Sequence, residues 1–558
     1  GGGGLGSRTG GLARELEKTT RKLGTRPILR KYGEAVQELT PLVLCSPSSV
    51  VDLIEPGVME FDLVIFDEAS QITVPEAVGA LGRARAAVVV GDSKQMPPTR
   101  KVGGGAVDDD DIDDPDAEEI VEDQESILSE CELARVPTLS HYRSQDEALI
   151  AFSNRTYYRG DLSSFPTPTL LSSETGLEFR HVRCPEKDDK GMYLRAGSAK
   201  VDLGNGVVAG SNTNPFEAVE IVKYIHELVH STDAMPSVGI VTFNEQQRQL
   251  IEDLLHASAD AKVSDVLDES KMGRGEALFV KALEQVQGDE RDVIVFSIAF
   301  SKQANGKVPT NFGPLSNAGG ERRLNVAVTR ARRKNVIFCS FNPASNELDV
   351  SGATYQGPKD LKQFLIDAQA AGSANDPAEA AHRLAIRDRH RDDIATAMRD
   401  AGLHVMSDVG LSNFRLDLVL ARPANPDRPL LPVLLDGESW RKRNTVSDRD
   451  VLPVEVLENL MGWPTVARIW WPMWLQNRDE VVARILTEVD RAEARLQGKP
   501  APEPGGDSVT GVLGQSASSS TAESDAVSPS RASTPMEEQQ EAEVPVEDFA
   551  AAVAPSYD

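Results

Sequence analysis

The chain has 558 residues, a formal net charge of −28 and 40% hydrophobic residues, a length that suits about two to four domains, each with its own core. Its four cysteines lie far apart without a CxxC pair, which argues against a zinc site or a disulfide framework and favours a reducing cytoplasm. No apolar run approaches the roughly 18 residues of a membrane span, so no membrane partner is expected.

Most of the negative charge sits in two segments. Residues 108–125 contain twelve acids and no lysine or arginine, and residues 500–558 contain eleven acids and one arginine. Segments with high net charge and few apolar residues do not bury enough surface to fold. We therefore expect an acidic disordered loop over 102–125 and a disordered acidic tail over 498–558. The remaining body is mildly acidic, so local arginines and lysines must make any phosphate contacts.

Residues 61–70, FDLVIFDEAS, predict a strand that delivers two acids to its carboxyl end. The apolar run from Leu63 to Phe66 is typical of a parallel strand covered on both faces. Asp67 and Glu68 follow at the edge where an α/β sheet binds its ligand. Two acids there suit phosphoryl transfer, one holding Mg²⁺ and the other activating water. The alternative for this stretch alone is a solvated strand end.

Four further stretches follow in order: AAVVVGDSKQMPPT (86–99), LSHYRS (139–144), VQGDERDVIVFS (286–297) and RRLNVAVTRAR (322–332). With FDEAS as Walker B, these resemble motifs III, IV, V and VI of superfamily 1 DNA/RNA helicases, in particular the AAA-type branch with a DEAS second motif. The resemblance covers roughly residues 30–345. It implies two RecA-like domains, ATP and Mg²⁺ as cofactors, and DNA or RNA, with a single strand expected, as partner.

The resemblance also implies roles for individual residues. Asp67 would carry Mg²⁺ and Glu68 would activate the attacking water. Gln95 would sense the terminal phosphate, with a plain turn residue as the alternative. Arg143 and Arg330 would reach the γ-phosphate from the second domain, because a guanidinium stays charged and bridges two phosphate oxygens.

Motif V and the end of motif VI supply the remaining nucleotide-site candidates. Gly288 would provide a tight turn that lets the backbone approach the ligand, and Glu290 would contact a ribose or the motif VI arginines. Arg332 is a further nucleotide-binding candidate, and a solvated or structural role is equally open for Arg332 and for Arg323.

No GxxxxGK[ST] loop occurs in the sequence, and Gly306-Lys307 is followed by valine. That loop grips the β- and γ-phosphates with backbone N–H groups and a lysine, and in the family it precedes Walker B. We therefore expect that the chain lacks the first part of its first RecA-like domain, with the Walker A segment preceding it in cis. By itself the chain should bind ATP poorly and hydrolyse it barely.

Strand and helix patterns alternate after motif IV, which predicts a parallel sheet covered by helices. Asn214-Pro215 reads as a helix start, and Asn244 as the cap of a helix over 245–256. The predicted fold class is α/β, with a partial and a complete RecA-like sheet, a small endonuclease-like domain and a tail. The predicted domains are 1–101 (first RecA-like), 102–125 (acidic loop), 126–350 (second RecA-like), 376–497 (endonuclease-like) and 498–558 (tail).

The strand–acid, strand–acid, helix, strand order of residues 376–497 resembles the restriction-endonuclease-like domain often fused behind such helicases. Asp417 and Asp436, expected at the ends of two paired strands, are the metal-ligand candidates. Leu434 stands where relatives usually carry a glutamate, and Glu438 is a possible substitute. An active nuclease and a DNA-binding relic are both open.

We interpret the chain as the C-terminal portion of an ATP-dependent superfamily 1 helicase or translocase. One alternative is a non-enzymatic nucleic-acid-binding or regulatory fragment that lost ATP turnover. Another is a helicase–nuclease fusion with an active endonuclease domain. The residues leave DNA versus RNA, the direction of movement and the oligomeric state open.

Overall fold

A computed structural model describes most of the chain up to residue 498. The described residues are 5–102, 120–123, 125–131, 140–169, 174–195, 197–231, 235–258, 260–268, 271, 276–373, 388–443 and 445–498. Most of the predicted acidic loop and all of the predicted tail after residue 498 lie outside them. Among the described residues, no helix combines the length and the apolar character needed to cross a bilayer.

The first part of the chain forms a two-stranded parallel sheet with helices. Its elements are α1 (Leu5–Leu16), α2 (Thr25–Leu39), α3 (Pro47–Leu53), β1 (Phe61–Phe66), α4 (Val74–Leu81) and β2 (Ala84–Val89). Side chains alternate between the two faces of a strand. Val64, Phe66 and Val89 accordingly pack against Ala77 and Ala80 of α4 on one face.

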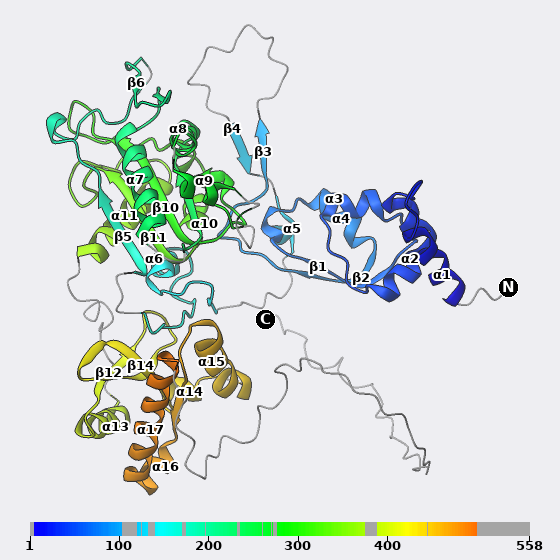
Figure 1. Cartoon of the computed structure of the whole chain (residues 1–558). Helices are drawn as coiled ribbons and strands as arrows, with labels where there is room; N and C mark the ends of the chain where they lie inside the picture. The colour runs from blue at the N-terminus through cyan, green and yellow to red at the C-terminus, as the bar shows by residue number, and fades with distance from the viewer. Residues whose placement is uncertain are drawn as a thin grey trace, which may run out of the picture. The chain divides into compact units, whose positions relative to one another are not determined.

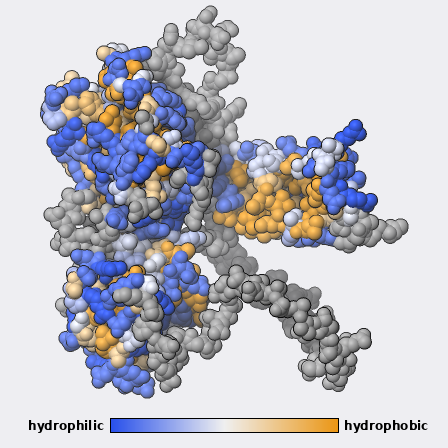
Figure 2. Space-filling view, in the orientation of Figure 1, coloured by the Kyte–Doolittle hydropathy of each residue, from blue (hydrophilic) through white to orange (hydrophobic). Residues whose placement is uncertain are grey.

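The prediction that β1 is covered on both faces is wrong for the described residues. Leu63 is 46% exposed and Ile65 is 60% exposed, and Val88 of β2 is exposed beside them. These side chains point away from α4, because they alternate with Val64 and Phe66. Figure 2 shows the resulting hydrophobic surface over β1 and β2.

The two ends of the predicted acidic loop pair with each other. Strand β3 (Thr99–Val102) pairs antiparallel with β4 (Ile120–Asp123), with Val102 opposite Ile120. Residues 120–123 were expected to be disordered, so that expectation is corrected here. The ladder satisfies backbone N–H and C=O groups whatever the net charge of the segment. A short helix, α5 (Ile127–Glu130), follows.

The second sheet has five parallel strands in the order β5-β11-β10-β8-β9. Strands β5, β10 and β11 are labelled in Figure 1. Its strands are β5 (Gly176–His181), β8 (Val238–Thr242), β9 (Phe279–Ala282), β10 (Arg291–Ser301) and β11 (Ala331–Ser340). A two-stranded hairpin, β6 (Val201–Asp202) and β7 (Val208–Ala209), lies outside this sheet. The parallel order confirms the predicted RecA-like α/β class.

Helices cover both faces of this sheet. One core joins the sheet to α6 (Ala148–Tyr157), α10 (Gly320–Val328) and α11 (Gly357–Ser373), and the other joins it to α7 (Pro215–Ser231), α8 (Glu245–His256) and α9 (Ala261–Leu267). Ile294 and Phe296 of β10 face the first core, and Val293 and Val295 face the second. Helix α11 lies beyond the predicted boundary at residue 350 and still contributes Phe364 to the first core.

The predicted helix starts are confirmed by their caps. The Asn214 side chain accepts a hydrogen bond from Glu217 N at 3.2 Å, and the Asn244 side chain accepts one from Gln247 N at 2.8 Å. Each cap satisfies a backbone donor that the first turn of a helix leaves free. The sequence therefore determines where α7 and α8 begin.

A buried carboxyl lies at the start of α7. Glu217 is fully buried and accepts hydrogen bonds from Ala299 N at 2.7 Å, Ser297 Oγ at 3.0 Å and Ser340 Oγ at 2.7 Å. Burial raises the pKa of Glu217 to about 7, although these donors lower it. The carboxyl joins α7 to β10 and β11 inside the second sheet.

The third part of the chain is a four-stranded mixed sheet in the order β12-β13-β14-β15. Strands β12, β13 and β14 pair antiparallel, and β14 and β15 pair parallel. The strands are β12 (His404–Val409), β13 (Leu416–Arg422), β14 (Asn425–Leu435) and β15 (Ala467–Ile469), and the helices are α13 (Arg389–Asp400), α14 (Glu438–Arg441), α15 (Leu452–Glu455), α16 (Trp471–Gln476) and α17 (Arg478–Leu496). The small mixed domain agrees with the predicted fold class.

The first prediction concerns Glu217. The raised folded-state pKa means that protonated Glu217 stabilises the domain fully below the unfolded-state pKa of about 4.5, and this contribution is lost as the pH rises through about 7. Between pH 5 and pH 8 the wild type should lose about 2 to 3 kcal/mol more unfolding free energy than Glu217→Gln. Hydrogen exchange of the β10 amides measures this domain alone.

A matched control is Glu220→Gln, on the exposed side of the same helix, which should behave like the wild type. Equal pH dependence in the wild type and Glu217→Gln would show that Glu217 is ionised in the folded domain.

Candidate functional site

The two acids after β1 stand at the carboxyl edge of the first sheet. Asp67 and Glu68 are both exposed, and Asp67 Oδ1 accepts a hydrogen bond from Glu68 N at 2.9 Å. Glu68 has a φ of 51°, a left-handed conformation that costs energy for a residue with a side chain. The next residue, Ala69, begins a short 3-10 helix, and its backbone N donates to Val90 O, directly after β2, at 2.9 Å. Both carboxylates are therefore available to a ligand.

The turn after β2 is organised by Asp92. Its carboxylate accepts hydrogen bonds from Lys94 N at 2.8 Å and from Gln95 Nε2 at 3.2 Å. The other side-chain atom of Gln95, Oε1, is buried and has no hydrogen-bond partner. A buried acceptor without a donor is costly, so Gln95 presents an atom that a ligand or a bound water can satisfy.

A hydrogen-bonded chain joins this turn to the second sheet. Tyr158, directly after α6, donates its hydroxyl to Asp92 Oδ2 at 2.5 Å, and Asn325 of α10 donates Nδ2 to the Tyr158 hydroxyl and to Lys94 O, each at 2.9 Å. Burial, and then the Asp92 carboxylate, raise the pKa of Tyr158, which keeps it a donor. Met96 follows the turn and is buried in the core of the second sheet.

Sequence reasoning did not select Asp92, Tyr158 or Asn325. Asp92 and Asn325 lie inside the quoted motifs, next to residues that were chosen, so motif position could have pointed to them. Tyr158 lies outside every motif, and the sequence holds no signal for it.

The two predicted phosphate-contacting arginines differ in environment. Arg330 is 3% exposed and donates Nε to Val326 O at 2.8 Å, whereas Arg143 is half exposed and pairs with Glu290 at 2.9 Å. Burial lowers the pKa of Arg330, and Arg143 lowers it further, while the Glu68 and Glu290 carboxylates raise it. The pKa of Arg330 is therefore influenced by the charges of Glu68, Arg143 and Glu290.

Arg332 is held by carboxylates of its own domain. Its guanidinium contacts Glu276 at 2.8 Å and Asp292 at 2.9 Å, and Glu290 lies at 3.6 Å. The Glu276 hydrogen bond raises the pKa of Arg332. These contacts support the structural alternative for Arg332. Gly288 has a φ of 87°, as expected for the tight turn before Glu290.

His141 of motif IV stays neutral beside these arginines. Its Nε2 lies 2.8 Å from Ser144 Oγ and accepts a hydrogen bond from Ser144 N at 3.3 Å. Burial, and then Arg143 and Arg330, lower the pKa of His141 to about 4. A neutral ring avoids adding a third positive charge, and it fixes the turn that carries Arg143.

The residues present fit a magnesium-bound nucleotide. Carboxylate oxygens are the ligands that Mg²⁺ prefers, and guanidinium groups suit phosphate oxygens. Several polar atoms of the motifs are buried without hydrogen-bond partners: Ser70 Oγ, Gln95 Oε1, Arg323 Nε and Asn325 Oδ1. Asp67 and Glu68 would hold the ion and its water, and Arg143 and Arg330 would face the phosphates.

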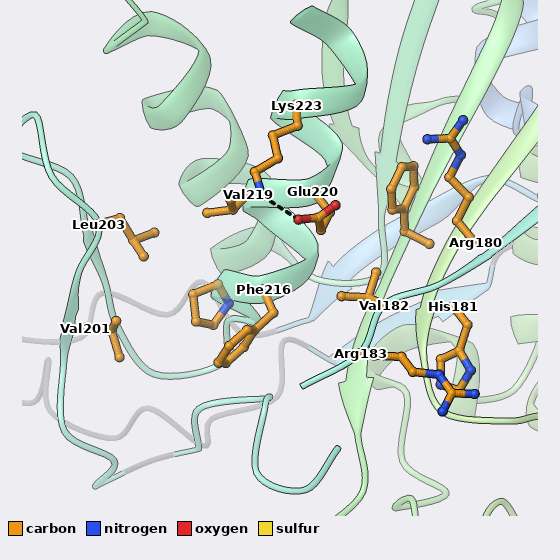
Figure 3. Close-up of a pocket in the computed structure, with 12 residues that line it drawn as sticks. Arg180, His181, Val182, Arg183, Val201, Leu203, Phe216, Val219, Glu220 and Lys223 are labelled. Atoms are coloured by element: carbon orange, nitrogen blue, oxygen red, sulfur yellow. Dashed lines mark hydrogen bonds and ion pairs between the residues drawn. The ribbon is translucent and has the colours of Figure 1, made fainter. Parts of the chain in front are cut away.

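A separate cavity of about 840 Å³ lies between β5 and α7 (Figure 3). Two of its basic residues have partners, since Lys223 pairs with Glu220 at 2.6 Å and the Arg180 guanidinium lies 4.4 Å from the Tyr224 ring centroid, whereas His181 Nε2 is buried without a hydrogen-bond partner. None of the predicted site residues lines this cavity. It is therefore not the site described by the motifs.

Asp417 and Asp436 come to the same edge of the third sheet. Asp417 lies near the start of β13 rather than at a strand end, but β13 and β14 are antiparallel, so it faces the end of β14. Asp417 Oδ2 accepts a hydrogen bond from Leu435 N at 2.7 Å, and Asp436 Oδ1 accepts one from Trp471 N at 3.0 Å. Burial raises the pKa of Asp417 to about 6.

The two positions considered for a third ligand, Leu434 and Glu438, do not supply one, although Asp388, which caps α13, lies near this edge and acts on Asp417. Leu434 is buried in a hydrophobic core, and Glu438 pairs with Lys442 at 2.8 Å. Neither Asp417 nor Asp436 belongs to a described group of three histidine, cysteine or acidic side chains with ligand atoms within 4.8 Å of one another. The geometry favours the relic over an active nuclease.

Three family models match the chain. An AAA domain model (AAA_11) matches residues 13–101, a second AAA domain model (AAA_12) matches 125–342, and the model REase_MTES_1575 matches 390–489. The matches follow the order of the three sheets.

Several curated proteins are similar to the chain. It is 29% identical over 351 residues to the uncharacterized ATP-dependent helicase MG140 of Mycoplasma genitalium. The aligned region covers 61% of this chain and 28% of that protein. It is 26% identical over 312 residues to the RNA helicase Mov10l1 of Homo sapiens, covering 53% and 24%. It is 26% identical over 299 residues to the DNA replication ATP-dependent helicase/nuclease DNA2 of Bos taurus, covering 50% and 24%. The chain thus spans about a quarter of the length of these relatives.

The second prediction concerns nuclease activity. Incubated with supercoiled DNA and Mn²⁺, the chain should show little nicking, because Asp417 and Asp436 belong to no described group of three ligands within 4.8 Å of one another and Asp417 is partly protonated near pH 6. Asp436→Ala and the exposed-strand control Asp427→Ala should match the wild type. Strong nicking that Asp436→Ala abolishes and Asp427→Ala retains would overturn the relic interpretation.

Proposed function

Because this chain carries superfamily 1 helicase domains followed by a restriction-endonuclease-like domain, we propose that it works as an ATP-dependent helicase or translocase motor on DNA or RNA. The observation that carries the proposal is the hydrogen-bonded contact between the motifs of the two sheets. Tyr158 donates to Asp92 at 2.5 Å and Asn325 of α10 donates to Lys94 O at 2.9 Å, so the turn after β2 is in contact with the elements that precede the buried Arg330. Acids after a strand of one sheet and an arginine from a second domain are the groups that phosphoryl transfer uses.

The acids after β1 would prepare the attacking water. MgATP, when bound, supplies the phosphoryl group that accepts this water. Asp67 would hold the ion, directly or through water. Glu68 would hold the attacking water and take its proton, and its exposed carboxylate is free to do so.

The arginines would stabilise negative charge on the phosphate oxygens. Arg330 is suited to this role because burial strengthens its electrostatic interactions and its position is fixed by its own helix. Arg143 reaches the same neighbourhood from the turn that His141 braces, and Glu290 balances its charge. This charge balance supports a site that a nucleotide completes.

Motif III would transmit the nucleotide state to the second sheet. Gln95 carries an unsatisfied buried oxygen, and its neighbours Asp92 and Lys94 bond to Tyr158 and Asn325. A change at Gln95 would therefore strain contacts with α6 and α10. Movement of the second sheet would follow from this link.

The names of the relatives indicate two nucleic acids to compare as substrates. DNA2 is named as a DNA replication ATP-dependent helicase/nuclease and Mov10l1 as an RNA helicase. The test therefore compares single-stranded DNA with single-stranded RNA.

The third prediction tests the motor. In the full-length protein, Glu68→Gln should lower nucleic-acid-stimulated ATP hydrolysis about 100-fold or more while MgATP binding persists, because a general base contributes about 10² to 10⁴ in rate. The steady-state rate is measured with each nucleic acid, and binding is measured with a fluorescent ATP analogue.

Asp62→Asn is the matched control, since Asp62 is a fully exposed acid on β1 and should leave the rate unchanged. Hydrolysis within a few-fold of wild type in Glu68→Gln would contradict the assignment of the base. No hydrolysis by the wild type with DNA or RNA would favour the non-enzymatic binding alternative.

A further inference from the structure

Two histidines and an aspartate converge on the outer side of the second sheet, away from every helicase motif in the sequence. His226 and His230 are four residues apart on α7, the helix that carries Glu220 and Lys223 in Figure 3, so they share one helix face. Asp260, the residue that caps α9, lies opposite them. His226 Nδ1 lies 3.1 Å and His230 Nε2 lies 2.7 Å from Asp260 Oδ2.

We propose that His226, His230 and Asp260 bind a divalent transition-metal ion of the Zn²⁺ class. The ligand atoms of the three residues lie within 4.8 Å of one another. Zinc ligands lie about 2.0 to 2.2 Å from the ion, so tetrahedral ligands are about 3.3 Å apart. The His226 distance of 3.1 Å is close to this spacing, and the His230 distance of 2.7 Å would have to open by about 0.6 Å. A fourth position stays open to water, because His230 is half exposed.

The donor set suits such an ion. Imidazole nitrogen is a preferred ligand of Zn²⁺, Cu²⁺ and Ni²⁺, and two histidines with this separation on one helix recur in zinc sites. The sequence argument against zinc considered cysteines, and this group contains none.

The surrounding residues orient the ligands. The two carboxylate oxygens of Asp260 have different partners. Oδ1 accepts the capping hydrogen bond from Lys262 N at 2.9 Å, and Oδ2 faces both histidines. Ser258 Oγ lies 3.0 Å from His226 Nε2, the ring nitrogen that does not face Asp260. Metal-binding histidines usually make such an outer hydrogen bond, which fixes the ring orientation.

A bound ion would link α7 to the N-terminal end of α9. Val263 and Val266 of α9 already pack in the same core as Ile225 and Val229 of α7. The ion would add a bond between these helices at the surface end of that core. Its role would be structural, and it is independent of the proposed ATP site.

The fourth prediction tests this site by calorimetric titration of the chelator-treated full chain with Zn²⁺, and by the visible absorption of Co²⁺ as a tetrahedral probe. We expect one strong equivalent. Asp260→Asn should weaken binding at least 10-fold while the helix stays capped, because Asn is as good a cap as Asp. His230→Ala should weaken it by about 10- to 100-fold or more.

His256→Ala, an exposed histidine at the end of α8, is the matched control and should bind like the wild type. Zn²⁺ should also raise the melting temperature of the wild type and of His256→Ala, but not that of Asp260→Asn. Equal affinity in the wild type and Asp260→Asn, or no binding at micromolar Zn²⁺, would overturn the proposal and leave a hydrogen-bonded ion pair.

Discussion

The hydrogen bond between the Tyr158 hydroxyl and the Asp92 carboxylate is the contact on which the rest of the arrangement depends. Asp92 shapes the turn that carries Gln95, and Tyr158 is held in place by Asn325 of α10. This bond is partly buried, and a hydrogen bond to a carboxylate is worth more than a neutral one, so leaving either partner unsatisfied is costly. Because Met96 enters the core of the second sheet directly after this turn, hydrophobic burial and the hydrogen bond hold the same segment.

The charges around this contact are balanced in a way that leaves room for a ligand. Arg143 and Arg330 repel each other, and the Glu68 and Glu290 carboxylates offset that repulsion. His141 is neutral and adds no positive charge to the cluster, because burial and both arginines lower its pKa. Polar atoms of Gln95 and Asn325 remain buried without partners. A phosphate-bearing ligand would accept hydrogen bonds from the two arginines, and a water held by that ligand would donate to the Gln95 and Asn325 oxygens, which links the proposed nucleotide site to the network.

The sequence determined most of the fold and part of the site. Caps at Asn214 and Asn244 and apolar runs such as that of β10 depend on local residues, so α7, α8 and the parallel sheet were predictable. The exposure of Leu63 and Ile65 was not, because an apolar run does not say whether one or both faces of a strand are covered. Tyr158 and the cluster of His226, His230 and Asp260 depend on long-range packing, which no local pattern encodes. The pairing of β3 with β4 was not predicted, because the expectation of a disordered loop over 102–125 was based on its acidic composition, and composition does not report backbone pairing.

The central claim is that Asp92 and Tyr158 join motif III to the second sheet, and a double-mutant cycle measures this directly. Unfolding free energies of the wild type, Asp92→Ala, Tyr158→Phe and the double variant are compared by hydrogen exchange of β10 amides, since every tryptophan lies at residue 440 or beyond and would report the third sheet. The account predicts a coupling free energy of about 1 to 2 kcal/mol, because each single variant removes the same hydrogen bond. Effects that add within about 0.5 kcal/mol would contradict it.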